Sequence, residues 1–152
     1  MRSQPCKTFP ILAAILVAFS ILAFANSHHD LNGTWKLIPT RSDFGGEPMI
    51  QTGTLTINDR EGNIYVSRNF SFDGENQSVS YSFSTDAREN TSIHEGKAFK
   101  SKAKWEGPVL KVVSTQDNIT STERYRLSGD GMLMLTVDRP GHRTINLFFE
   151  RQ

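Results

Sequence analysis

From residue 33 onward, hydrophobic and polar side chains alternate along the chain with a period of two. The alternating runs are short, and clusters of Gly, Asp, Asn and Pro separate them at intervals of roughly 8 to 12 residues. This pattern is typical of antiparallel strands joined by tight turns. It predicts strands at residues 33–39, 49–58, 63–72, 77–85, 98–105, 109–115, 120–128, 132–139 and 143–150, with a weaker one at 91–95.

The alternation is one-sided. In the run at 77–85, Val79, Tyr81 and Phe83 share one face, and serines occupy the other. In the run at 98–105, apolar side chains oppose lysines, which we interpret as a solvated face. One face of each strand is therefore expected to be dry and the other wet.

A sheet of this many strands can cover its apolar side by curling into a barrel, which also removes exposed edges. The sequence therefore predicts an all-β domain, an antiparallel up-and-down β-barrel of eight to ten strands. In a meander with an even number of strands, the first and last strands can pair antiparallel and close the barrel. A two-sheet sandwich is the alternative.

The first segment is predicted to be a leader and not part of the fold. Arg2 and Lys7 precede an uncharged apolar run at 11–24 that is shorter than the roughly 20 residues of a membrane-spanning helix. The run ends in small residues around Phe24, as signal-peptidase sites do. We therefore expect a cleaved signal at 1–25, a flexible N-terminus at 26–32, a domain at 33–152, and a secreted or periplasmic location. An uncleaved anchor is the alternative.

The amino-acid composition excludes several classes of protein. The chain has 152 residues, with Lys+Arg 17 against Asp+Glu 16, so it lacks the basic field that nucleic-acid binding usually needs. A hydrophobic share of 37% with 10 Phe is too high for a disordered chain. The only cysteine, Cys6, lies in the predicted signal, which leaves the domain without a disulfide. We expect a monomeric globular domain with no stable membrane span after signal cleavage.

Several segments resemble known proteins. Gly33-Thr34-Trp35 resembles the Gly-x-Trp motif of lipocalins and the related fatty-acid-binding barrels, the calycin group. Residues 42–45, 104–107, 123–131 and 135–139 resemble segments of secreted bacterial lipocalin-like proteins. The resemblance implies a barrel with a ligand cavity, and it implies that Arg151 packs on Trp35 as a cation–π pair. The loop at 40–48 is too short and glycine-rich for the helical pair that fatty-acid-binding proteins have there.

The expected register separates the two ends of the barrel. The closed end is expected to hold Trp35, Trp105, Leu127, Leu133, Phe149 and Arg151. The open end is expected to carry the loops at 40–48, 73–76, 116–119 and 140–142. The loop at 40–48 is the natural lid, and its Phe44 either plugs the mouth or packs beneath its own loop.

Arginines on the apolar face are the sharpest chemical feature. Arg68, Arg139 and Arg143 extend inward-facing apolar rows, with Arg68 the deepest. A buried guanidinium needs an anion, because leaving it unpaired costs several kcal/mol. Glu123, inward on its own strand, is one candidate partner for Arg68. A ligand carboxylate, which a guanidinium binds through two hydrogen bonds, is the other.

These features predict an exported barrel that binds a small hydrophobic ligand, with an acidic head group as a further option. The predicted ligand-binding residues are Arg68, Phe70, Phe72, Tyr81, Phe83, Phe99, Tyr125, Arg139 and Arg143. Two alternatives remain: a filled barrel that contacts another envelope protein, and an isomerase that uses His94 or Glu123 as its base. The sequence contains no catalytic motif, and none of His28, His29, His94 and His142 has metal-ligand spacing. We therefore expect no enzyme activity, no metal and no cofactor.

Overall fold

The computed structural model describes residues 31–94 and 96–152, so the predicted signal at 1–25 lies outside the described residues. The described chain forms ten strands and one short 3-10 helix, η2. Their bounds are β1 Gly33–Leu37, η2 Pro39–Arg41, β2 Thr52–Arg60, β3 Asn63–Phe72, β4 Glu75–Ser84, β5 Asn90–His94, β6 Lys97–Glu106, β7 Val109–Gln116, β8 Ile119–Leu127, β9 Leu133–Asp138 and β10 Ile145–Arg151.

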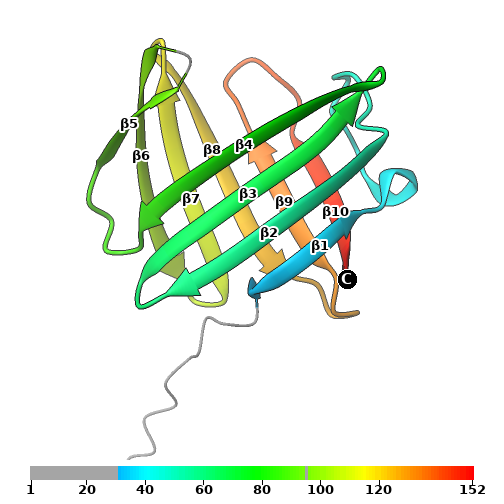
Figure 1. Ribbon diagram of the computed structural model, residues 1–152, viewed down its shortest axis with the longest axis horizontal. Coiled ribbons are helices and arrows are strands. Elements are labelled where there is room, and N and C mark those ends of the chain that lie inside the picture. The colour runs from blue at the N-terminus through cyan, green and yellow to red at the C-terminus, as the bar shows by residue number, and fades with distance from the viewer. Residues whose placement is uncertain (1–30, 95) are drawn as a thin grey trace, which may run out of the picture.

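All ten strands belong to one antiparallel sheet, which curls into a nearly closed barrel (Figure 1). The first and last strands pair, with Trp35 opposite Arg151, and the sheet order is β4-β3-β2-β1-β10-β9-β8-β7-β6-β5. The predicted fold class and the pairing of the terminal strands are thus confirmed. The ladder is interrupted between β4 and β5, where only an isolated bridge joins Asp86 to Lys104.

Two predicted strands begin later than expected. The run predicted from residue 49 becomes strand only at Thr52, and the run predicted from residue 143 only at Ile145. In both cases loop geometry overrides the alternation. Gly45 and Gly46 have positive φ, and the loop is tied to the barrel by a bridge between Asp43 and Asn146.

The inner face of the barrel is apolar, as the alternation predicted. The largest fully buried side chains include Trp35, Tyr125 and Phe149, and Phe83 of β4 is 3% exposed. Lys100, Lys102 and Lys104 of β6 are exposed and pair with Glu89 or Glu106. Two-residue turns hold the strands in register, because both central residues of the β3–β4 turn, Asp73 and Gly74, have the positive φ that a tight hairpin requires.

The closed end explains why the chain has glycine at position 33. The Arg151 guanidinium lies over the Trp35 ring, 4.2 Å from its centroid, and its Nη1 donates to the Asn32 carbonyl at 2.6 Å. Gly33 has φ +133, and a Cβ there would lie 2.8 Å from Arg151 Nη1. Gly33 therefore leaves room for the guanidinium, while Trp35 Nε1 donates to the Leu31 carbonyl at 2.9 Å. The predicted pairing of Arg151 with Trp35 is present.

Within the described part of the chain, no helix has the length and apolar character needed to cross a membrane.

Candidate ligand-binding cavity

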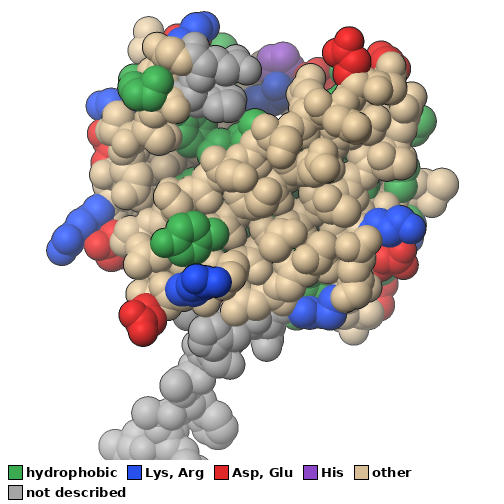
Figure 2. Space-filling model, in the orientation of Figure 1, with side chains coloured by type: hydrophobic (Ala, Val, Ile, Leu, Met, Phe, Trp, Pro, Cys, Tyr) green, Lys and Arg blue, Asp and Glu red, His purple; other side chains and the backbone are tan. Residues whose placement is uncertain are grey.

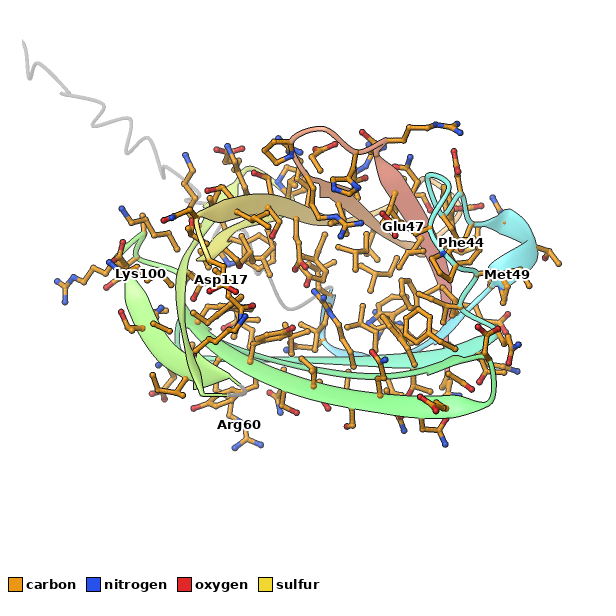
Figure 3. The ribbon with its side chains drawn as sticks, turned by 90° about the horizontal axis from the view of Figure 1, so that it is seen from above. Phe44, Glu47, Met49, Arg60, Lys100 and Asp117 are labelled. Atoms are coloured by element: carbon orange, nitrogen blue, oxygen red, sulfur yellow. The ribbon has the colours of Figure 1, made fainter. Side chains whose placement is uncertain are left out.

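A cavity of about 370 Å³ lies inside the barrel beneath its open end. Figure 3 looks down on this end, and there Phe44 and Glu47 lie on the same side of the mouth. The walls come from the loop between β1 and β2 and from β3, β8, β9 and β10. The lining residues are Phe44, Glu47, Pro48, Ile50, Arg68, Phe70, Phe72, Ser121, Glu123, Leu135, Val137, Arg139, Ile145 and Leu147.

A glycine on β2 shapes one wall of this cavity. Gly53 pairs with Phe70 across β2 and β3, and it is buried. A Cβ at Gly53 would lie 2.5 Å from Cδ1 of Phe70. The missing side chain therefore lets the Phe70 ring lie against the barrel wall, where it stacks on Phe149 with 6.3 Å between centroids.

The other predicted aromatic residues form a second group, on the β4–β6 side. Tyr81, Phe83 and Phe99 line a smaller cavity of about 100 Å³, which shares Ser121 and Glu123 with the large one. Tyr81 and Phe99 stack with 5.5 Å between centroids, and this contact spans the margin where β4 and β5 do not pair. A hollow of about 220 Å³ beside it reaches the β7–β8 turn.

Arg68 and Glu123 meet at the deep end of the large cavity. Arg68 Nη2 donates to Glu123 Oε2 at 2.5 Å and also to the hydroxyl of Tyr125, which itself donates to Glu123 Oε2 at 2.7 Å. Both charged side chains are largely buried, at 15% and 14% exposure. The Arg68 guanidinium also lies 5.4 Å from the centroid of the Tyr81 ring. Of the two partners predicted for Arg68, the internal one is thus present.

The contact between Arg68, Glu123 and Tyr125 determines the protonation state of Glu123 and Tyr125. Burial raises the pKa of Glu123, but the charge of Arg68 and the hydrogen bonds from Arg68 and Tyr125 outweigh it and hold that pKa below its usual value. Burial raises the pKa of Tyr125 well above its usual value, which keeps the phenol protonated. A Glu123 held ionised by Arg68 is a weak proton acceptor, so the geometry does not favour it as a catalytic base.

A second ion pair ties the lid to the rim. Arg139 Nη2 donates to Glu47 Oε1 at 2.8 Å, and His142 Nδ1 lies 3.2 Å from the same oxygen. Phe44, from the same loop, packs against the hydrophobic core and lines the cavity. It therefore covers part of the cavity from above.

Two predicted binding residues, Arg143 and Tyr125, line neither of the two inner cavities. Arg143 was expected to point inward, but it is exposed and precedes the start of β10, because the turn at Pro140 and Gly141 occupies this stretch. Tyr125 is fully buried and reaches the site through its hydroxyl group. The other predicted ligand-binding residues line one of the two inner cavities, and their role in binding stays a prediction.

Sequence reasoning missed several cavity residues. Leu135, Val137, Ile145 and Leu147 belong to the inward rows of β9 and β10, but aliphatic side chains there are as typical of a filled core as of a cavity wall. The sequence pattern does not indicate that Glu47 lies at the cavity, because its contact with Arg139 depends on the path of the loop between β1 and β2.

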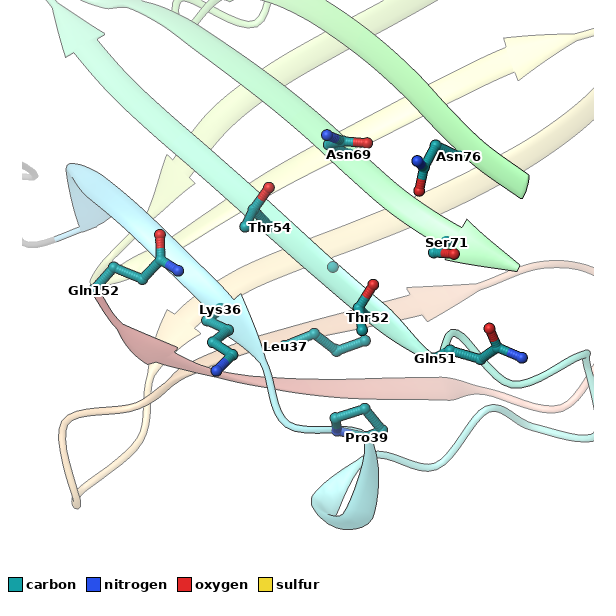
Figure 4. A pocket seen from close by; sticks show the side chains of 11 residues that line it. Lys36, Leu37, Pro39, Gln51, Thr52, Thr54, Asn69, Ser71, Asn76 and Gln152 are labelled. Carbon is teal, nitrogen blue, oxygen red and sulfur yellow. The ribbon is translucent and has the colours of Figure 1, made fainter. Parts of the chain in front are cut away.

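The outside of the barrel has a different character. Most of the face formed by β2 to β4 is free of charged side chains, which gather at its margins (Figure 2). A hollow of about 290 Å³ on this side is lined largely by hydroxyl and amide groups, among them Thr52, Thr54, Asn69 and Asn76 (Figure 4). Ligand pockets are lined mainly by hydrophobic side chains, so this polar outer hollow suits a small ligand less well than the inner cavity does.

Among residues 31–94 and 96–152, no three His, Cys, Asp or Glu side chains gather as a metal site would require.

Solved structures of similar fold include fatty-acid-binding proteins. Fatty-acid-binding protein 1 of Echinococcus granulosus matches with a TM-score of 0.63 at 14% identity, covering 81% of this chain and 98% of that one. A fatty-acid-binding protein of Schistosoma mansoni, solved with arachidonic acid, matches with a TM-score of 0.60 at 18% identity, covering 83% and 98%. A secretory abundant heat soluble protein of Ramazzottius varieornatus matches with a TM-score of 0.62 at 18% identity, covering 81% and 96%.

At these identities the likeness establishes the fold, which is that of fatty-acid-binding barrels. The search against family models found no match to the sequence, and neither did the search of curated proteins. The expected calycin-type barrel is therefore supported, whereas no sequence-family match supports the narrower resemblance to secreted bacterial lipocalin-like proteins.

Proposed function

We propose that this fatty-acid-binding-like barrel binds a small, largely apolar molecule in its interior. The observation that carries the proposal is the cavity of about 370 Å³ under the lid, lined mainly by aromatic and aliphatic side chains. Ligand pockets of proteins typically measure about 300 to 1,000 Å³, so this volume suits a compact ligand. The solved barrels of similar fold include proteins named for fatty-acid binding, which supports the same ligand class.

The finer part of the proposal concerns the polar end of the ligand. Arg68 and Ser121 line the cavity, and both can donate a hydrogen bond to a ligand oxygen. An acidic head group is one ligand that would use these donors, and a neutral carbonyl or hydroxyl is another. The choice between them depends on the charge that already lies in the cavity.

The proposal also includes export and a monomeric state. Export rests on the charge and hydropathy pattern of residues 1–25.

Filling the cavity tests the proposal. Val137→Trp adds a large ring at a position that lines the cavity, and we expect it to abolish stabilisation by ligand. In the wild type, a ligand present at 100 times its Kd raises the free energy of unfolding by about 2.7 kcal/mol. The measurement is the shift in Tm with a panel of medium-chain fatty acids, alcohols and alkanes.

Met134→Trp is the matched control for this experiment. Met134 alternates with the buried Leu133 and Leu135 on β9 and therefore points outward, so the variant adds the same bulk outside the cavity. We expect this variant to keep the ligand-induced shift. If no compound in the panel stabilises the wild type, or if Val137→Trp responds as the wild type does, the barrel is not an interior binder.

A further inference from the structure

The charges that line the large cavity balance one another. Arg68 is paired with Glu123 at the deep end, with 2.5 Å between nitrogen and oxygen. Arg139 is paired with Glu47 at the rim, at 2.8 Å. The cavity therefore contains two guanidinium groups but no uncompensated positive charge.

Arg68 nevertheless has hydrogen-bond donors to spare. Its two hydrogen bonds both leave from Nη2, toward Glu123 and Tyr125. Its Nε is buried without an acceptor within the described residues, and Nη1 makes no hydrogen bond there either. Nε has almost no accessible surface, so no ligand atom reaches it without a rearrangement. Nη1 is the donor left for an acceptor oxygen supplied from the cavity that Arg68 lines.

The nature of that oxygen follows from Glu123. A ligand carboxylate at Arg68 would place a second anion on a guanidinium that already holds one, beside a Glu123 side chain that is only 14% exposed and therefore poorly screened from the new charge. Two carboxylates that share one site cannot both stay ionised easily, so one of them would have to take up a proton. A carbonyl or hydroxyl oxygen accepts the same hydrogen bond without this cost.

We infer that the deep end of the cavity accepts a neutral oxygen group, so that the ligand is an alcohol, aldehyde, ketone or ester with a compact apolar body. This inference rests on the proposed function, since it names the ligand class of the same cavity. Ser121 lines the cavity beside Glu123, and its hydroxyl can donate to a carbonyl or accept from an alcohol.

The test compares 1-decanol with decanoate, which share one chain length and differ in the head group. Binding to the wild type at pH 7 is measured by isothermal titration calorimetry. We expect decanol to bind at least about tenfold more tightly than decanoate. We also expect decanoate, where it binds, to take up about one proton, which is seen as a binding enthalpy that depends on the buffer.

Glu123→Gln separates the effect of charge from the lower hydrophobicity of decanoate. The amide oxygen of glutamine can still accept from Arg68 and Tyr125, but the negative charge is gone. We expect the preference for decanol over decanoate to fall by at least about tenfold in this variant, and the proton uptake to disappear.

Glu47→Gln is the matched control, because it removes the carboxylate of the rim pair and leaves the deep pair intact. A larger change of preference in Glu47→Gln than in Glu123→Gln would place the head group at the rim and overturn the inference. Equal or tighter decanoate binding by the wild type, without proton uptake, would overturn it too, and this result needs no variant to fold. If neither compound binds while another member of the panel does, the inference is overturned; if no member of the panel binds, the proposed function itself fails.

Discussion

Replacing Glu123 with alanine is expected to lower the free energy of unfolding by about 3 to 5 kcal/mol at neutral pH. The substitution removes the anion and leaves the guanidinium of Arg68, only 15% exposed, without a charged partner in the barrel interior. Urea denaturation followed by tryptophan fluorescence measures the loss.

Two comparisons test whether burial of the ion pair causes the large loss of stability in Glu123→Ala. The pair of Lys97 with Asp117 is just as short, at 2.6 Å, but both side chains are more than half exposed. Asp117→Asn is therefore expected to cost less than about 1 kcal/mol. Arg68→Met with Glu123→Leu replaces the buried pair by apolar side chains, and we expect this double variant to regain most of the stability lost in Glu123→Ala. If Glu123→Ala lowers the free energy of unfolding as little as Asp117→Asn does, water reaches the Arg68 guanidinium freely.

The penalty of Glu123→Ala should also depend on pH. The folded-state pKa of Glu123 is held below its usual value, so its ion pair contributes stability that is fully present above the unfolded pKa of about 4.3. This contribution is lost as the pH falls through the folded-state pKa. The difference in unfolding free energy between the wild type and Glu123→Ala is therefore expected to shrink below about pH 4. A difference that stays constant from pH 7 to pH 3 would contradict the assigned ionisation.

Replacing Trp35 with alanine is expected to cost about 3 to 5 kcal/mol of unfolding free energy. Trp35 is fully buried, donates to the Leu31 carbonyl, and carries the guanidinium of Arg151 on its ring. The variant would leave a void at the closed end and remove the side-chain contact between Trp35 of β1 and Arg151 of β10, while their backbone pairing remains possible. The loss can be measured as a drop in the denaturation midpoint.

Trp35→Phe is the control, because phenylalanine keeps a ring beneath Arg151 and loses the indole N–H. We expect it to retain more than half of the stability that Trp35→Ala loses. If the two variants are equally unstable, the hydrogen bond to Leu31 rather than ring packing holds the closed end together.

The alternation of side chains was sufficient to predict the strands and their closure. Val79, Tyr81 and Phe83 could be assigned to the inner face because burial of one face leaves only one register. The pairing of Arg68 with Glu123 was foreseen as one of two options, because both residues continue inward rows and a buried guanidinium needs an anion.

What the sequence could not predict depends on loop paths and on local volume. Arg143 was misplaced because the turn before β10 overrides the alternation, and the contact of Glu47 with Arg139 joins two loops whose courses are set by tertiary packing. The cavity itself was undecidable from the pattern, because inward Phe70 and Phe72 could line a space or fill it. Ser121 is a small side chain on the cavity wall, and Gly53 lets the Phe70 ring lie against that wall.

The missing ladder between β4 and β5 has a mechanical consequence. In a fully closed barrel every strand pairs with two neighbours. Here β4 and β5 form the two margins of the sheet, so a separation between them would leave all the β-ladders intact. Among the described residues, the bridge from Asp86 to Lys104 of β6 and the stacked rings of Tyr81 and Phe99 join the two sides of that line. A guest bulkier than the cavity would strain the wall first along this line, because separation there breaks the fewest backbone hydrogen bonds.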